Sequence, residues 1–144
     1  MPGQRVANRV VRVVLRTPLL CRVVGGRLLT IEVVGRTSGR HFVVPVAYTR
    51  HEGALLVGTP FGWARNLRTG DLVKVRLQGR RRTAEVRVIK DEDGVIEHYV
   101  VIARDNRQFA KFNKIGFDAD GEPSRKDLQR RWADGARVLV LSVR

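Results

Sequence analysis

Residues 35–40, with the sequence GRTSGR, combine side chains and backbone groups that suit the binding of an anion. The two glycines permit a tight turn, in which hydroxyl and guanidinium groups surround backbone N–H groups. The forked guanidinium of arginine binds phosphate or carboxylate, and threonine and serine add short-range donors. An exposed hairpin turn with two solvated arginines would have the same composition, and composition alone favours that simpler account.

Residues 59–68, with the sequence TPFGWARNLR, form a second cluster, which follows a strand-like run and begins a short helix. Trp63 and Asn66 are three residues apart, so we expect them on one face of that helix. The indole can form the wall for an apolar ring, while the amide or the start of the helix meets a polar tail. A core tryptophan beside a capping asparagine is the simpler account, and for this cluster alone it is the better one.

Other kinds of chemistry find no support in the sequence. His41, His51 and His98 share no spacing with carboxylates that would indicate a metal site. The sequence has neither a Gly-x-Ser-x-Gly elbow nor a Walker-type phosphate loop, which argues against a nucleophilic enzyme. Cys21 is the single cysteine, so no intrachain disulfide or zinc-binding cysteine pair can form, and a reducing cytoplasm is the compartment that we expect.

Short strand-like runs separated by turn residues must position these clusters. They begin after Gly25 and Gly26 and cover residues 28–34, 41–49, 54–58, 72–77, 82–89 and 138–143. Pro45 indicates an edge position or a bulge, because proline cannot donate to a strand ladder. Acidic residues 91–93 suit the start of a helix that ends before Gly116, and residues 116–124 have the composition of a loop. The pattern predicts a mainly β fold with peripheral helices (α+β), with about six antiparallel strands in a small barrel.

Residues 1–24 are predicted to form an N-terminal amphipathic helix, ahead of a barrel domain at residues 25–144. Arg5, Arg9, Arg12 and Arg16 recur at three- and four-residue steps, which places them on one helical stripe beside a valine-rich arc. Such a helix can lie on an anionic membrane surface. A helix that packs on its own barrel and solvates its arginines has the same pattern, and it is the commoner arrangement in soluble domains.

The composition describes a single basic globular domain. The chain has 144 residues, 43% of them hydrophobic, which suits one packed core. Its formal charge of +14 predicts attraction to polyanions such as nucleic acid, acidic lipid surfaces or phosphorylated cofactors. Specific nucleic-acid binding is disfavoured, since the arginines are spread along the whole chain and only 6% of the residues are aromatic. No run of apolar residues has the length of a membrane span or a secretory signal, so we expect a soluble or peripheral protein.

Taken together and in order, the GRTSGR turn, Pro45 and the WARNLR segment resemble the deazaflavin-dependent nitroreductase and quinone reductase family. The similarity runs from about Leu28 to Val88 and includes the final strand. It implies a split β-barrel that binds coenzyme F420, the deazaflavin of actinobacteria, with FMN as the alternative because some relatives use ordinary flavins. Related barrels often dimerise with a cofactor at the seam, which makes a homodimer a further expectation.

The resemblance implies eight cofactor-binding residues from three segments: Arg36, Thr37, Ser38, Val43, Pro45, Thr59, Trp63 and Asn66. The three turn residues would line the phosphate-bearing side of the cofactor, and Val43 and Pro45 would approach its ring system. Thr59 would lie near the tail or the ring edge. Trp63 and Asn66 match the Trp-x-x-Asn-Leu motif of the family and would belong to the cofactor pocket.

The sequence departs from the family in its connection before the tryptophan and at two strand positions. Many relatives have a lysine and a longer loop where Pro60, Phe61 and Gly62 stand, and many have a basic residue in place of Phe42. Ala47 replaces a tyrosine of the nitroreductase members. No catalytic residue is therefore assigned, and solvent, Tyr48 or His41 are the candidate proton sources.

The predicted function is hydride transfer from a reduced deazaflavin or flavin to a small electron acceptor, which would be a quinone, a nitroaromatic or an activated enone. A non-catalytic carrier of the same cofactor is the main alternative, and a basic nucleic-acid-binding protein is another. We expect the protein in the cytoplasm, with a peripheral position at the inner face of the cell membrane if the N-terminal helix binds acidic lipid.

Overall fold

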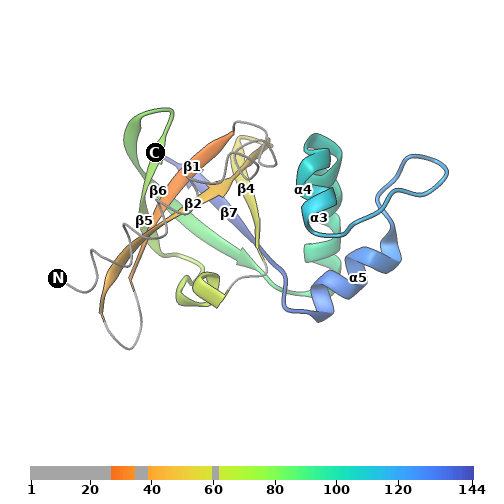
Figure 1. The fold of residues 1–144 in the computed structure, drawn as a ribbon. Helices are drawn as coiled ribbons and strands as arrows, with labels where there is room; N and C mark the ends of the chain where they lie inside the picture. Colours follow the sequence, from red (N-terminus) through yellow and green to blue (C-terminus); the bar gives the residue numbers. More distant parts are fainter. Residues whose placement is uncertain (1–26, 35–38, 60–61) are drawn as a thin grey trace.

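Antiparallel strands make up most of the part of the chain that the computed structural model describes, which is residues 27–34, 39–59 and 62–144 (Figure 1). A short 3₁₀ helix, η1, lies between the fourth and fifth strands, and three α-helices precede the last strand. The elements in chain order are β1 (Leu28–Val34), β2 (His41–Ala47), β3 (Thr49–His51), β4 (Ala54–Thr59), η1 (Gly62–Asn66), β5 (Leu72–Leu77), β6 (Arg80–Ile89), α3 (Glu92–Asp105), α4 (Arg107–Phe112), α5 (Arg125–Ala133) and β7 (Arg137–Val143).

The strands form one curled sheet with the order β2-β1-β5-β6-β7-β4-β3, and all of its pairs are antiparallel. The two end strands, β2 and β3, are separated only by Tyr48. The Tyr48 N–H donates to the Arg27 carbonyl oxygen at 3.2 Å, and Thr49 is already in register with Leu56 of β4. One bent segment thus supplies both end strands and joins the two sides of the sheet, which curls into a split barrel with β2 and β3 as its edge strands.

The predicted fold class is confirmed, with one correction to the strand count. The run at residues 41–49, predicted as a single strand, bends at Tyr48 and forms two, because its second part leaves β1 to pair with β4. Pro45 lies on the end strand β2, as predicted from its missing N–H.

The barrel interior is filled by the alternate residues of its strands. Leu29, Ile31 and Val33 of β1 point inward, as do Val73 and Val75 of β5. The intervening side chains point outward and are polar or charged on β5 and β6. This period of two is the pattern expected of a strand with one buried face.

The three α-helices cover only one side of the barrel, over β4 and β7 (Figure 1). Leu56, Val138 and Val140 pack against the helices, whereas Leu55 and Leu139 face the barrel interior. Both faces of these two strands are therefore buried, which explains their nearly continuous apolar sequences.

The predicted helix before Gly116 is present but is divided in two. Asp91 caps α3 by accepting a hydrogen bond from the Gly94 N–H at 2.9 Å, and acidic residues follow it, as predicted. Asn106 then has an extended backbone, and its side chain caps α4 by accepting from the Phe109 N–H at 3.1 Å. An internal asparagine that can cap a new helix thus ends the first one.

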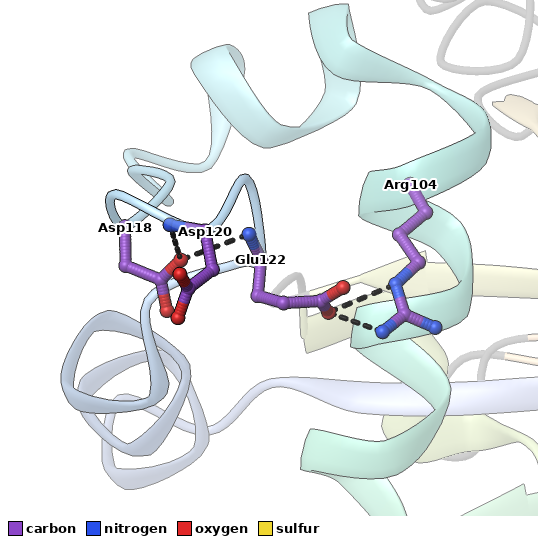
Figure 2. A network of polar contacts seen from close by, with 4 residues as sticks. All are labelled: Arg104, Asp118, Asp120 and Glu122. Atoms are coloured by element: carbon purple, nitrogen blue, oxygen red, sulfur yellow. Dashed lines mark hydrogen bonds and ion pairs between the residues drawn. The ribbon is translucent and has the colours of Figure 1, made fainter.

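The loop predicted at residues 116–124 is present, and its own polar groups order it (Figure 2). One carboxylate oxygen of Asp118 accepts hydrogen bonds from the N–H groups of Asp120 and Glu122, both at 3.0 Å. The Glu122 carboxylate forms an ion pair with Arg104 of α3, as Figure 2 shows. The following helix, α5, was not predicted from the sequence. Leu128 is its single buried residue, so the helix has no apolar stripe that a sequence pattern would show.

The predicted N-terminal helix at residues 1–24 lies outside the described residues. Among the helices that the structure describes, none is long and apolar enough to cross a membrane.

Candidate functional site

The strand register brings several element ends to one end of the barrel. β1 ends here at Val34, which pairs with His41 at the start of β2. β5 runs antiparallel to β1 and begins here at Leu72. β4 also ends here, since Thr59 pairs with Arg137 at the start of β7. We call this the loop end of the barrel; it holds the end of β1, the start of β2, the end of β4, η1 and the start of β5.

Three of the predicted site residues, Arg36, Thr37 and Ser38, lie outside the described residues. Gly39, the first described residue after them, has a φ of +64°, the left-handed conformation that favours glycine.

Trp63 and Asn66 lie on η1 at the same loop end. Trp63 is half-buried and packs against the core of the barrel, and Ala64 and Leu67 are buried beneath the segment. The short helix is of the 3₁₀ type, in which residues three apart are eclipsed. Trp63 and Asn66 therefore share one face, as their spacing predicts, and both retain exposed surface.

Thr59 supports this arrangement from inside the protein. Its exposed fraction is 3%, and it has the same strand parity as Leu55 and Val57, which face the barrel interior. As the last residue of β4, it precedes the connection to η1 directly. In the described structure it is a buried residue next to the site rather than part of an open surface.

Val43 and Pro45 occupy a different part of the molecule, the outer face of β2. They are in register with Glu32 and Thr30 of β1, whereas Val44 points into the core. No helix of the described chain covers this face. The structure thus brings Thr59, Trp63 and Asn66 together at the loop end, and places Val43 and Pro45 beside that end on an adjoining surface.

Cationic side chains surround both parts of the site. Arg65 and Arg68 are exposed at the loop end, and Arg65 passes over Gly135, where an added Cβ would lie 3.8 Å from its Nη2. The backbone at Arg68 is fixed by its N–H, which donates to Asp71 Oδ2 at 2.8 Å.

A shallow hollow of about 170 Å³ borders Val43 on the outer face. The sequence prediction did not include the charged residues that line it, which come from β1, β5 and β6: Glu32, Lys74, Arg76 and Arg81. The alternation of β5 shows that Lys74 and Arg76 are outward-facing, but only the cross-strand register shows that they lie near Val43. Sequence reasoning therefore had no signal that joins these residues to the site.

The family model described as F420H(2)-dependent quinone reductase matches residues 7–113, most of the chain. The chain belongs to this family. It is therefore a flavin- or deazaflavin-dependent oxidoreductase, and the family name supports coenzyme F420 as its cofactor and implies a quinone as its acceptor. Among curated proteins, none matches its sequence significantly.

Solved structures share the fold of this reductase at low sequence identity. A candidate 5-nitroimidazole antibiotic resistance protein from Bacteroides thetaiotaomicron has a TM-score of 0.52 and 14% identity, over 84% of this chain and 75% of its own. An FAD and heme binding protein from Mycobacterium smegmatis has a TM-score of 0.50 and 17% identity, over 89% of this chain and 66% of its own. A pyridoxamine 5'-phosphate oxidase-related, FMN binding protein from Nostoc punctiforme has a TM-score of 0.50 and 13% identity, over 93% of this chain and 78% of its own. These similarities confirm the split-barrel fold.

The side chains of the candidate site fit the parts of a deazaflavin. Val43 and Pro45 offer a half-buried apolar surface for a planar ring, and Trp63 offers an indole at the adjacent loop end. Arg65 and Arg68 are cationic, as the phosphate-bearing side of the cofactor requires.

Proposed function

We propose that this reductase binds the ring of F420 on the outer face of β2 and the phosphate-bearing side of the cofactor at the loop end. The observation that supports this most strongly is the register of β1 with β2. It places Val43 and Pro45 outward on an uncovered face, two and four residues after His41, where the turn at residues 35–40 ends. A strand rises by about 3.3 Å per residue, so these positions lie within the length of one extended cofactor.

The residues of the chain would bind and orient the two reactants. When bound, the reduced deazaflavin supplies the hydride that the quinone accepts. Val43 and Pro45 would support one side of the ring and keep water from it, while Arg36, Arg65 and Arg68 would hold anionic groups. β2 is paired along its whole length with β1, so this supporting surface is rigid.

His41 is the residue best placed to hold a proton near the acceptor. It shares its strand parity with Val43 and Pro45 and is exposed at the start of β2. Tyr48, the other side chain considered for this role, is only 5% exposed and belongs to the barrel core. The described structure therefore favours His41 or solvent as the proton source.

Nitroaromatics and activated enones belong to the same proposal as alternative acceptors, because each offers an electrophilic conjugated system to a hydride. An open face can admit such acceptors beside the ring. A carrier that binds the cofactor without turnover would fail with all of them.

Contact with an acidic membrane surface from the cytoplasmic side is a further part of the proposal. Arg5, Arg9, Arg12 and Arg16 and the net charge of +14 support it. Removal of residues 1–18 is expected to abolish the salt-sensitive binding of the protein to acidic liposomes. Unchanged binding by the truncated protein would contradict it.

Oxidation of reduced F420 by a soluble quinone, followed by absorbance, tests the reductase proposal. We expect protein-dependent turnover, with kcat/KM lowered at least tenfold by Trp63→Ala, about 1.4 kcal/mol. Phe112→Ala removes an exposed aromatic side chain from α4, on the far side of the sheet, and should leave kcat/KM unchanged. Equal rates in Trp63→Ala and the wild type would contradict the proposed site.

A further inference from the structure

A wide, open hollow lies away from the loop end, beside the β5–β6 hairpin and the end of β7. Its volume is about 670 Å³. We call it the basic cavity; the residues that line it are Lys74, Arg81, Arg82, Thr83 and Arg144. Four of the five are cationic, and none is acidic.

Two carboxylates at the border of the basic cavity compensate only part of this charge. Arg81 forms an ion pair with Glu32 at 3.3 Å, and Arg144 approaches Glu85 at 3.8 Å. Within the part of the chain that the structure describes, neither Lys74 nor Arg82 forms an ion pair with an Asp or Glu side chain. The side chains around the cavity therefore leave it positive, in a protein that already carries a charge of +14.

Hydrogen bonds hold these cations in place before any ligand arrives. Lys74 Nζ donates to Thr83 Oγ1 at 2.9 Å, and Arg82 Nε donates to the main-chain oxygen of Arg144 at 2.7 Å. The Arg144 N–H in turn donates to the Thr83 carbonyl oxygen at 2.9 Å, which fixes the end of β7 against β6. Such preorganisation lowers the entropy that a ligand must overcome on binding.

The remaining donors suit a tetrahedral oxyanion. Thr83 Oγ1 accepts from Lys74, so its own hydroxyl proton remains able to donate. The lysine ammonium and the terminal nitrogens of Arg82 add donors from two further residues. A phosphate group offers three strong acceptor oxygens and about −1.5 to −2 charges at pH 7, which matches several donors better than a single carboxylate does.

We infer that the basic cavity binds a phosphate-bearing ligand at a site that adjoins the cofactor position proposed above. Lys74 and Arg81 also line the hollow beside Val43, whereas Arg82, Thr83 and Arg144 line only the basic cavity, and none of these three lies at the loop end. The inference does not rest on that cofactor position and is tested without F420. The phosphate would belong either to a soluble small molecule or to a lipid headgroup, and both sources present the same chemistry to these side chains.

Amide NMR of the full chain tests the site, with inorganic phosphate added in a phosphate-free buffer. We expect saturable shifts at Thr83 and Arg144, and affinity at least tenfold lower in the double variant Arg82→Gln, Arg144→Gln. The control double variant Arg125→Gln, Arg130→Gln removes the same charge from exposed positions on α5 and should retain the wild-type affinity. Thermal unfolding of both variants checks that each remains folded.

Sedimentation with vesicles separates the two sources of phosphate. Vesicles of phosphatidylcholine with and without phosphatidic acid are compared on the same three proteins. Residues 1–18 are the same in all three proteins, so any binding that they provide to acidic vesicles does not differ between them. Weaker binding to phosphatidic acid vesicles by the Arg82 and Arg144 variant than by the control supports a lipid headgroup. Saturable inorganic phosphate binding, with equal vesicle binding by all three proteins, supports a soluble ligand. Equal losses in the two double variants, or no saturable phosphate binding together with equal vesicle binding, would overturn the inference.

Discussion

β5 and β7 both pair with β6, yet they are buried in different ways. β5 alternates strictly between exposed and buried residues, whereas β7 has four consecutive buried residues from Val138 to Leu141. The difference arises because α3 and α5 pack outside β7, and no described helix lies outside β5. The helix-covered half of the sheet, β4 and β7, thus has two buried faces, and the open half, β1, β2, β5 and β6, has one.

The two halves of the sheet are expected to contribute differently to stability and to ligand binding. The covered half contributes apolar area on both faces, which is the main favourable term in folding. The open half keeps charged side chains close together, including Arg76 directly opposite Arg81, a pairing that costs stability. We therefore expect substitutions of outward-facing residues to change the free energy of unfolding in the covered half and ligand binding in the open half.

Leu56→Ala should cause the largest loss of stability. Leu56 is buried on the face of the covered half that packs against the helices, and loss of such a leucine side chain costs about 2–5 kcal/mol in transfer and cavity terms. Leu72→Ala in the open half should change the free energy of unfolding by less than about 0.5 kcal/mol, because Leu72 is 57% exposed. Urea unfolding measures both. Equal losses would contradict the division of the sheet.

Gly58→Ala should cause the second largest loss of stability, because the added methyl group overfills the contact between β4 and the helices. A Cβ at Gly58 would lie 2.8 Å from Phe109 Cζ and 3.0 Å from Tyr99 Cε1, and overpacking of this kind costs about 1–3 kcal/mol. Gly62→Ala on η1 meets open space and should stay within about 0.5 kcal/mol of the wild type. Urea unfolding measures both variants. A Gly58→Ala variant as stable as the wild type would mean that the helix layer is loosely packed.

Tyr99→Phe should reduce the loss of stability that the protein shows at high pH. Burial raises the pKa of Tyr99, and within the described residues its hydroxyl has no hydrogen-bond partner. Above pH about 10 the unfolded state loses this proton and the folded state keeps it, so unfolding becomes easier by about 1.4 kcal/mol per pH unit. The variant should lose that part of the pH dependence, and at pH 7 it should be as stable as the wild type or slightly more stable. Parallel stability curves for both proteins between pH 9 and pH 11 would contradict the burial of this hydroxyl.

Arg76→Thr should have the smallest effect and the opposite sign. It removes the like charge opposite Arg81 and places a β-branched residue in a strand, so we expect a gain of about 0.2–0.5 kcal/mol. The gain should shrink at high salt, where exposed charges are screened. Arg81→Thr is the matched comparison, because it also removes the ion pair with Glu32 and should gain less. Thermal unfolding at low and high salt measures both variants.

The sequence was sufficient to predict the elements whose patterns are local. Period-two alternation predicted β5 and β6, flanking turn residues marked β1, and the acidic start of α3 marked its first turn. The bend at Tyr48 was missed because it depends on pairing with β4 after the barrel closes, which local sequence does not specify. α5 was missed because its position rests on distant contacts, such as the hydrogen bond from Trp132 Nε1 to the Lys90 carbonyl oxygen.

The candidate site likewise has some relations that local sequence predicts and others that depend on strand pairing. The three-residue spacing of Trp63 and Asn66 predicted their shared face, since that relation lies within one turn. The proximity of Val43 to Lys74 and Arg81 comes instead from pairing across β1, β5 and β6, and no spacing along the chain reveals it.

The most direct test of the account is an equilibrium fluorescence titration of the folded protein with oxidised F420. The central claim is that the cofactor binds at the loop end and the open half, away from the helices. The account predicts that Trp63→Ala raises the Kd at least tenfold, while Phe112→Ala on α4 binds as the wild type does. Wild-type affinity in Trp63→Ala, or an equal loss in both variants, would contradict it.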